Sequence, residues 1–196
     1  MTCDPLVTTA MADDAYTDAG TGKLARLMDR DLTSLDDVRL FCAAAKGGHP
    51  KIVHWLINER FPAFTPHLQS HLAAITGGPD VYAVFLARWP HLMTWDLGHN
   101  GNPLGSSAFC GDKDMVAFLL SRGADPNVAH FIHRPLWRYP DWVVKDGGGT
   151  QILDLMIAHG FHISEVDERR ARQKGSVRQK TSLPRTCGIR AGCVLQ

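Results

Sequence analysis

Few residues of this 196-residue chain have the types and spacing that chemistry requires. Gly20-Thr21-Gly22-Lys23 looks like the end of a phosphate-binding loop, which cradles phosphates with glycine backbone amides and a lysine. The earlier glycine of that loop is replaced by Thr17, and Leu24 stands where Ser or Thr would bind magnesium. The chain also contains no Gly-x-Ser-x-Gly elbow and no His-Glu-x-x-His pair. These motifs therefore do not predict a catalytic site or a cofactor.

Two pairs of histidines have a spacing that could hold a metal ion. His67 and His71 would share one face of a helix, and His130 and His133 lie close in sequence. No Cys or acidic residue stands at the usual ligand spacing from either pair. We therefore expect no metal site, no small-molecule substrate and no enzymatic activity.

The strongest pattern is an ordered series of elements between Asn102 and Asn127. A Pro-Leu helix start leads into a short helix of small residues, a turn at Gly111, a second apolar helix, and an exit at Gly123-Ala124-Asp125. Proline suits the first turn of a helix, and glycine suits the left-handed residue that ends one. This order of elements resembles an ankyrin repeat.

The same pattern recurs along the chain. The Ala-Ala-x-x-Gly-His motif of Ala44 to His49 precedes Ile52 to Ile57, Ala73 to Gly77 precedes Val81 to Leu86, and a weaker fourth copy runs from Arg134 to Phe161. Aligned on glycines 48, 77, 111 and 148, the copies lie 29, 34 and 37 residues apart, around the ~33 typical of ankyrin arrays. The chain thus resembles an ankyrin repeat protein of about four repeats, with degenerate first and last copies.

This resemblance implies an all-α fold, an α-solenoid of stacked helix-turn-helix units with short hairpin or loop fingers. The apolar positions of each second helix form one stripe that only a neighbouring repeat can bury, so Leu119 is expected in the core. We predict a disordered N-terminal tail at residues 1–18, an ankyrin repeat domain at residues 19–165, and a basic segment at residues 166–196. Gly22 to Met28 resembles the second helix of the degenerate leading repeat.

The C-terminal segment differs in composition from the repeats. Residues 166–196 carry eight Arg or Lys and two acidic residues, a net charge of +6, and contain few apolar residues. Either a repeat is cut short here or the segment is a basic disordered tail. Its last four residues, from Cys193, fit a prenylation box, which a chance match would also explain. Membrane binding is expected only if Cys193 is prenylated, and nucleic-acid binding is not favoured because no aromatic residue lies in the segment.

In the ankyrin family, partners bind the concave face, which is made of fingertips and the exposed side of each first helix. Carried onto this chain, that face includes the residues before the turn glycines and those of the fingers: Lys46, Ile75, Thr76, His99, Asn100, Phe109, His133 and Trp137. For Ile75, Phe109 and Trp137 the alternative is packing against a neighbouring segment.

Two functions follow from these observations. The first is a non-enzymatic module that binds a protein partner through the concave ankyrin surface. The alternative is an adaptor that the basic tail directs to a membrane, through Cys193, or to the nucleus. The five cysteines form no C-x-x-C pair, and the first residues lack the pattern of a signal peptide, so we expect a cytoplasmic or nuclear protein.

Overall fold

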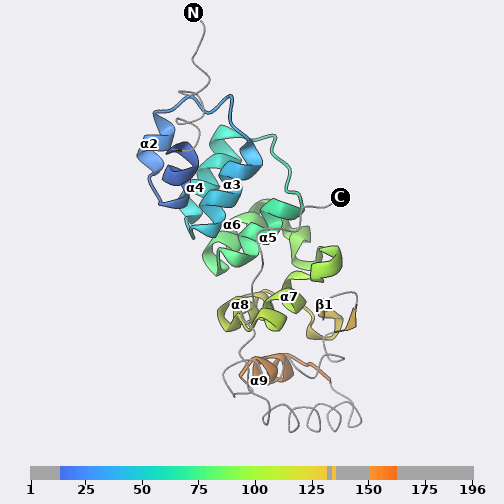
Figure 1. Cartoon of the computed structure of the whole chain (residues 1–196). Helices are drawn as coiled ribbons and strands as arrows, with labels where there is room; N and C mark the ends of the chain where they lie inside the picture. The colour runs from blue at the N-terminus through green and yellow to red at the C-terminus, as the bar shows by residue number, and fades with distance from the viewer. Residues whose placement is uncertain (1–13, 132–133, 136–150, 163–196) are drawn as a thin grey trace, which may run out of the picture. The chain divides into compact units, whose positions relative to one another are not determined.

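The computed structural model describes residues 14–131, 134–135 and 151–162. They belong to two compact units, Met1–Leu97 and Gly98–Gln196. Figure 1 shows that short helices dominate both units, so the predicted all-α class is confirmed.

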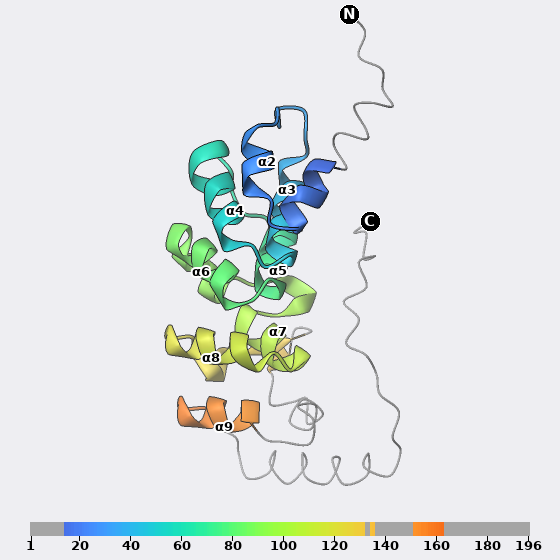
Figure 2. The same ribbon diagram turned by 90° about the vertical axis from the view of Figure 1, so that its left-hand side faces the viewer.

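Helices of the first unit come in antiparallel pairs separated by tight turns. They are a helix at residues 14–20, α2 (Leu24–Met28), α3 (Asp37–Lys46), α4 (Pro50–Trp55), the π-helix η1 (Leu56–Arg60), α5 (Leu68–Thr76), α6 (Pro79–Arg88) and the 3-10 helix η2 (Pro90–Thr94). The first helix α3 packs against α5, and the second helix α4 packs against α6. Figure 2 shows α4 and α6 on one side of this unit and α3 and α5 on the other.

The second unit repeats the arrangement. Its elements are η3 (Gly98–Asn100), α7 (Pro103–Cys110), α8 (Lys113–Ser121), η4 (Pro126–Val128), β1 (His130–Phe131), β2 (Arg134–Pro135) and α9 (Gln151–Ala158). Helix α8 packs between α7 and α9, and β1 pairs antiparallel with β2, with His130 opposite Pro135. This hairpin is a short finger of the predicted kind.

Side chains at the helix starts explain where several helices begin. Asp36 accepts hydrogen bonds from the backbone N–H groups of Val38 and Arg39 before α3. Asn102 and Asp112 cap α7 and α8 in the same way. These bonds satisfy amides that have no partner inside the helix.

Close backbone approach joins consecutive repeats in the first unit. The buried residues of α3 and α5 include Ala44, Ala45, Ala73 and Ala74, which leave little space between the two helices. At Gly77, which has ordinary helical dihedrals, an added Cβ would overlap the carbonyl oxygen of Ala45. Gly77 is therefore required by the neighbouring repeat and not by its own backbone conformation.

The predicted alignment of the repeats is wrong by one residue in the second copy. The left-handed turn residue is Gly78, with φ of +89°, and not Gly77, with φ of −77°. Counted on Gly48, Gly78 and Gly111, the repeats lie 30 and 33 residues apart. Either of two adjacent glycines could occupy the turn, and the pattern of the surrounding residues does not distinguish them.

The predicted N-terminal boundary is also wrong. Residues 14–18, which the sequence assigned to a disordered tail, belong to the helix at residues 14–20, where Ala15, Asp18 and Ala19 are buried. This helix is the first helix of the leading repeat, and α2 is its second helix, as predicted. Residues 1–13 and the basic segment 166–196 lie outside the described residues.

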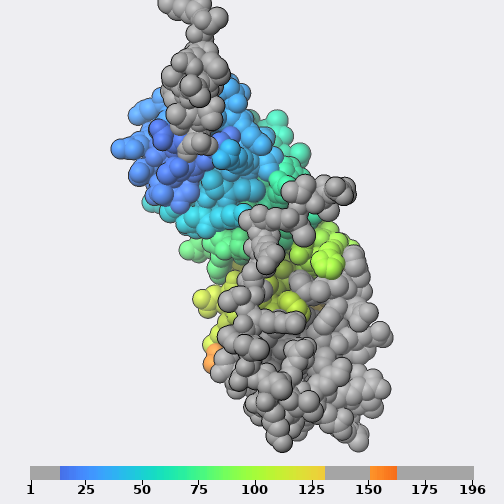
Figure 3. Space-filling view, viewed as in Figure 1, coloured from blue at the N-terminus to red at the C-terminus, as the bar shows by residue number. Residues whose placement is uncertain are grey.

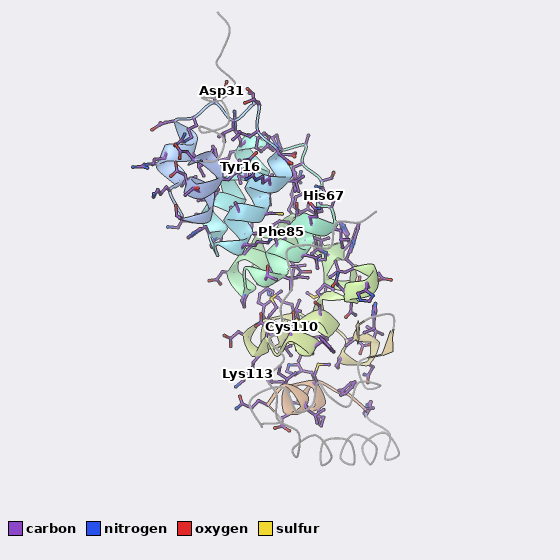
Figure 4. The ribbon with its side chains drawn as sticks, in the orientation of Figure 1. Tyr16, Asp31, His67, Phe85, Cys110 and Lys113 are labelled. Atoms are coloured by element: carbon purple, nitrogen blue, oxygen red, sulfur yellow. The ribbon has the colours of Figure 1, made fainter. Side chains whose placement is uncertain are left out.

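Aromatic side chains pack around the loop between η1 and α5 in the first unit. The rings of Phe41 and Phe64 stack with their centroids 3.9 Å apart, and Trp89 meets Phe64 edge-on at 6.0 Å. Phe85, labelled in Figure 4, lies 5.7 Å from Trp89 between ring centroids. The loop between η1 and α5 is therefore anchored by stacking and not by strand pairing.

Polar side chains link the repeats of the second unit. The amide of Asn127 donates to the carbonyl oxygen of Gly160 at 3.0 Å, and its oxygen accepts from the N–H of His162 at 3.0 Å. Asn102 donates to the carbonyl oxygen of Val128 at 3.0 Å and accepts from the N–H of Gly105 at 2.8 Å. The Asn127 amide satisfies two backbone groups of the segment at residues 160–162, and the Asn102 amide satisfies backbone groups of two separate segments, so the exit of one repeat positions the next.

Substitution of Leu119 tests the packing of the second unit. Leu119 is fully buried on α8, as predicted, so Leu119→Asp places a carboxylate in an apolar interface and should cost several kcal/mol. Thermal unfolding followed by circular dichroism should lose its cooperative transition. Ser121→Asp, at an exposed position of the same helix, should leave the transition intact. Equal melting temperatures for the two variants would contradict this packing.

Candidate partner-binding surface

Three predicted residues occupy the same position in successive repeats. Lys46, Thr76 and Phe109 each lie two residues before a glycine with positive φ, at the end of a first helix. Lys46 and Thr76 are exposed on α3 and α5, two helices that pack side by side. Phe109 is half-buried on α7, in the second unit. This repeated position is thus solvent-accessible in the first unit.

Ile75 does not belong to this surface. Its side chain is only 5% exposed, and it takes the place that the buried Ala45 and Ala108 hold in the other repeats. The prediction of a free apolar position was wrong because the alignment on Gly77 shifted this repeat by one residue. The alternative, that Ile75 packs inside the protein, is confirmed.

The structure describes two of the predicted finger residues, and they differ in exposure. His99 is exposed and Asn100 is half-buried, and both lie in η3. His133, Trp137 and the proposed lipidation site Cys193 lie outside the described residues.

Arg39 is a surface residue that the sequence analysis missed. Its exposed guanidinium lies over the ring of Tyr16, 4.2 Å from the centroid, and the Tyr16 hydroxyl accepts from the N–H of Asp36 at 3.1 Å. Figure 4 labels Tyr16 on the helix at residues 14–20. Arg39 precedes Lys46 by two helical turns, so the helical period of α3 places the two cations on one face. The separation of Arg39 and Lys46 by two helical turns was the feature of the sequence that could have indicated this shared face.

A buried carboxylate organises the charges of the leading repeat. Asp18 accepts a hydrogen bond from Arg30 at 2.8 Å, and Lys23 and Arg26 approach the same carboxylate at 3.7 Å. Arg30 supplies the direct partner that a buried charge needs, and the two other cations are largely solvated. The network thus places exposed parts of two cations around one buried carboxylate in the leading repeat.

His71, one of the candidate metal ligands, is instead part of a buried structural network. Its Nε2 lies 2.7 Å from the hydroxyl of Tyr82, which donates to the carbonyl oxygen of Leu92 at 2.7 Å. Because the single hydroxyl proton goes to Leu92, Nε2 carries the imidazole proton and donates to Tyr82. Nδ1 is then an acceptor, buried and without a partner among the described residues. Figure 4 shows His67, the other half of the pair, at the start of α5.

Burial also sets the charge state of this network. It lowers the pKa of His71 to about 4, with a smaller contribution from His91, and raises the pKa of Tyr82. Both groups are therefore neutral at pH 7. They hold η2 against α5 and α6.

Acid should destabilise the first unit through His71. The unfolded chain takes up a proton near pH 6.5 and the folded chain only near pH 4, so stability present above pH 6.5 is lost as the pH falls to 4. The shift corresponds to roughly 3 kcal/mol at 1.36 kcal/mol per pKa unit. Unfolding free energies of the parent and His71→Gln, measured by urea between pH 7 and pH 4, should converge as the pH falls. Parallel pH profiles would show that His71 titrates normally in the folded state.

One comparison with known proteins matches part of the second unit. The family model described as "Ankyrin repeat" matches residues 101–130. This segment is therefore similar to an ankyrin repeat. It spans α7, its turn at Gly111, α8 and the exit to β1, the stretch that the sequence analysis identified as the clearest copy. Comparisons with curated proteins and with solved structures found no match.

The match supports a module of the protein–protein interaction kind, because ankyrin repeats mediate such interactions and are typically non-enzymatic. Across the described ranges, no helix is long and apolar enough to cross a bilayer, and no group of three potential metal ligands gathers.

Proposed function

We propose that this chain is a non-enzymatic module that binds a protein partner through the exposed ends of its first helices. The proposal rests on the alternation of buried and exposed side chains at these helix ends. Lys46 and Thr76 are exposed, whereas the residues before them, Ala45 and Ile75, are buried. A side chain at the exposed position can change without disturbing the core, which is the property that a recognition surface needs.

The charge of this surface supports a polar, electrostatically steered contact. Arg39 and Lys46 lie on one face of α3, and Gln69 and Thr76 lie on the neighbouring α5, all of them exposed. In the second unit, the half-buried Phe109 holds the equivalent position, and aromatic side chains are favoured as interface anchors. Rim charges of this kind mainly raise association rates and set specificity.

A titration with matched variants tests the proposed surface. A partner captured by the full chain and identified by mass spectrometry is purified and titrated against Lys46→Ala/Thr76→Ala and Phe109→Ala by calorimetry. Truncation of a binding residue should cost ~1 to 4 kcal/mol of binding. Arg88→Ala, which removes an exposed cation from the second helix α6, is the control and should bind like the parent. If the control loses as much affinity as the double variant, the partner binds elsewhere.

The basic tail supports a second role as an adaptor directed to a membrane or to the nucleus. Two features of the sequence support this role: the net charge of +6 over residues 166–196 and the prenylation box at Cys193. A single lipid chain binds membranes marginally, and a neighbouring basic run supplies the second signal that stable anchoring needs. Without lipidation, the proposed location is the cytoplasm or the nucleus.

Expression of the parent and of Cys193→Ser in eukaryotic cells tests the adaptor role. The parent should gain the mass of a prenyl group at Cys193 and sediment with membranes, and the variant should do neither. A parent of unmodified mass with the same soluble distribution as Cys193→Ser would reject lipidation.

A further inference from the structure

The second helices of the first unit enclose a groove that the proposed function does not use. It measures about 510 Å³ and is open to solvent. Leu24 and Met28 of α2, Trp55 of α4 and Val84 of α6 supply apolar lining, and Lys51 and Glu59 are also among the lining residues. Met28 is 56% exposed, a high value for a large apolar side chain. The groove therefore exposes apolar surface on helices other than the partner-facing α3 and α5.

The π-helix η1 brings Lys51 and Glu59 onto one line along the same side of the helix. In a regular α-helix, residues eight apart differ by about 80° around the axis. Residues 56–60 form a π-helix, whose wider turn rotates the chain less per residue. Glu59 therefore returns toward the line of Lys51, and both side chains line the groove and are exposed. Single π turns are rare and often lie at functional sites.

The order of charges along this line makes the groove complementary to itself. Lys51 lies four residues before Trp55, and Glu59 lies four residues after it. If a second copy were related by a twofold axis near Trp55, its α4 would lie antiparallel to this one. Lys51 would then face Glu59 of the partner subunit, and Glu59 would face the partner's Lys51. A twofold contact uses the same patch on both subunits, so one residue pair forms two ion pairs.

We infer that this groove is a homodimer interface, in which two copies of the chain associate through α4 and η1. Burial of Met28 and of the apolar lining supplies the non-specific part of the contact. The antiparallel charge pairs fix its register and orientation. The dimer leaves the exposed ends of α3 and α5 free, so each assembly would present two copies of the proposed partner surface and bind a repeated partner with avidity.

Charge reversal with rescue tests this interface. Sedimentation velocity of the full chain, from about 1 to 500 µM, should show a reversible monomer–dimer equilibrium, since small interfaces bind weakly. Lys51→Glu and Glu59→Lys each create two like-charge contacts and should weaken dimerisation by roughly tenfold or more. The double variant restores opposite charges and should dimerise within about threefold of the parent. Circular dichroism at micromolar concentration verifies the fold of each variant.

Two controls separate this interface from other associations. Met28→Ser should weaken the dimer without changing its salt dependence, whereas the effect of each charge reversal should shrink in 1 M NaCl. Arg88→Glu, at an exposed site that does not line the groove, should leave dimerisation unchanged. A parent that stays monomeric at 500 µM would overturn the inference, as would a double variant that dimerises no better than the single variants.

Discussion

The close approach of neighbouring first helices is the constraint on which the first unit depends. Helices α3 and α5 meet through alanines and through Gly77, whose missing Cβ makes room for the carbonyl oxygen of Ala45. A protein interior packs as densely as a crystal, so such a contact cannot accept larger side chains without moving the backbone. Variation is therefore confined to the outward positions of these helices, Lys46 and Thr76 among them. The same constraint that stabilises the stack leaves a surface free for recognition.

Departures from regular helix geometry lie where the first unit differs from a uniform array. The π-helix η1 extends α4 and reorients Glu59, and the 3-10 helix η2 is held by the network from His71 through Tyr82 to Leu92. Both irregular helices follow the second helix of a repeat. The core that the repeats share tolerates them because they lie at the ends of helices and not between α3 and α5.

The sequence predicted the helix pairs well because each second helix carries an apolar stripe with helical period. Leu119 and Met156 are fully buried on two such stripes, and the clearest copy coincides with the matched ankyrin repeat. The helix at residues 14–20 was missed because its buried side offers only Ala15, Asp18 and Ala19, which carry little hydrophobic signal. The π turn was missed because Leu56 and Ile57 continue the apolar pattern of α4 and no Gly or Pro interrupts residues 56–60.

The candidate site was predictable in position but not residue by residue. Alignment on Gly77 placed Ile75 at the exposed end of α5, while the left-handed turn at Gly78 placed Thr76 there. Where two glycines are adjacent, the sequence does not indicate which one adopts positive φ, because both lack the Cβ that disfavours this conformation. Arg39 was missed because its position follows from the geometry of α3 and not from any motif.

Thermal unfolding of Gly77→Ala, compared with Thr76→Ala, tests the central constraint most directly. Gly77 has helical dihedrals, so in an isolated helix pair alanine would stabilise the fold by about 0.4 to 1 kcal/mol. We expect the opposite sign: Gly77→Ala should lower the melting temperature, because its Cβ overlaps the Ala45 carbonyl, while Thr76→Ala should leave it nearly unchanged. A rise in melting temperature for Gly77→Ala would contradict close packing between the repeats.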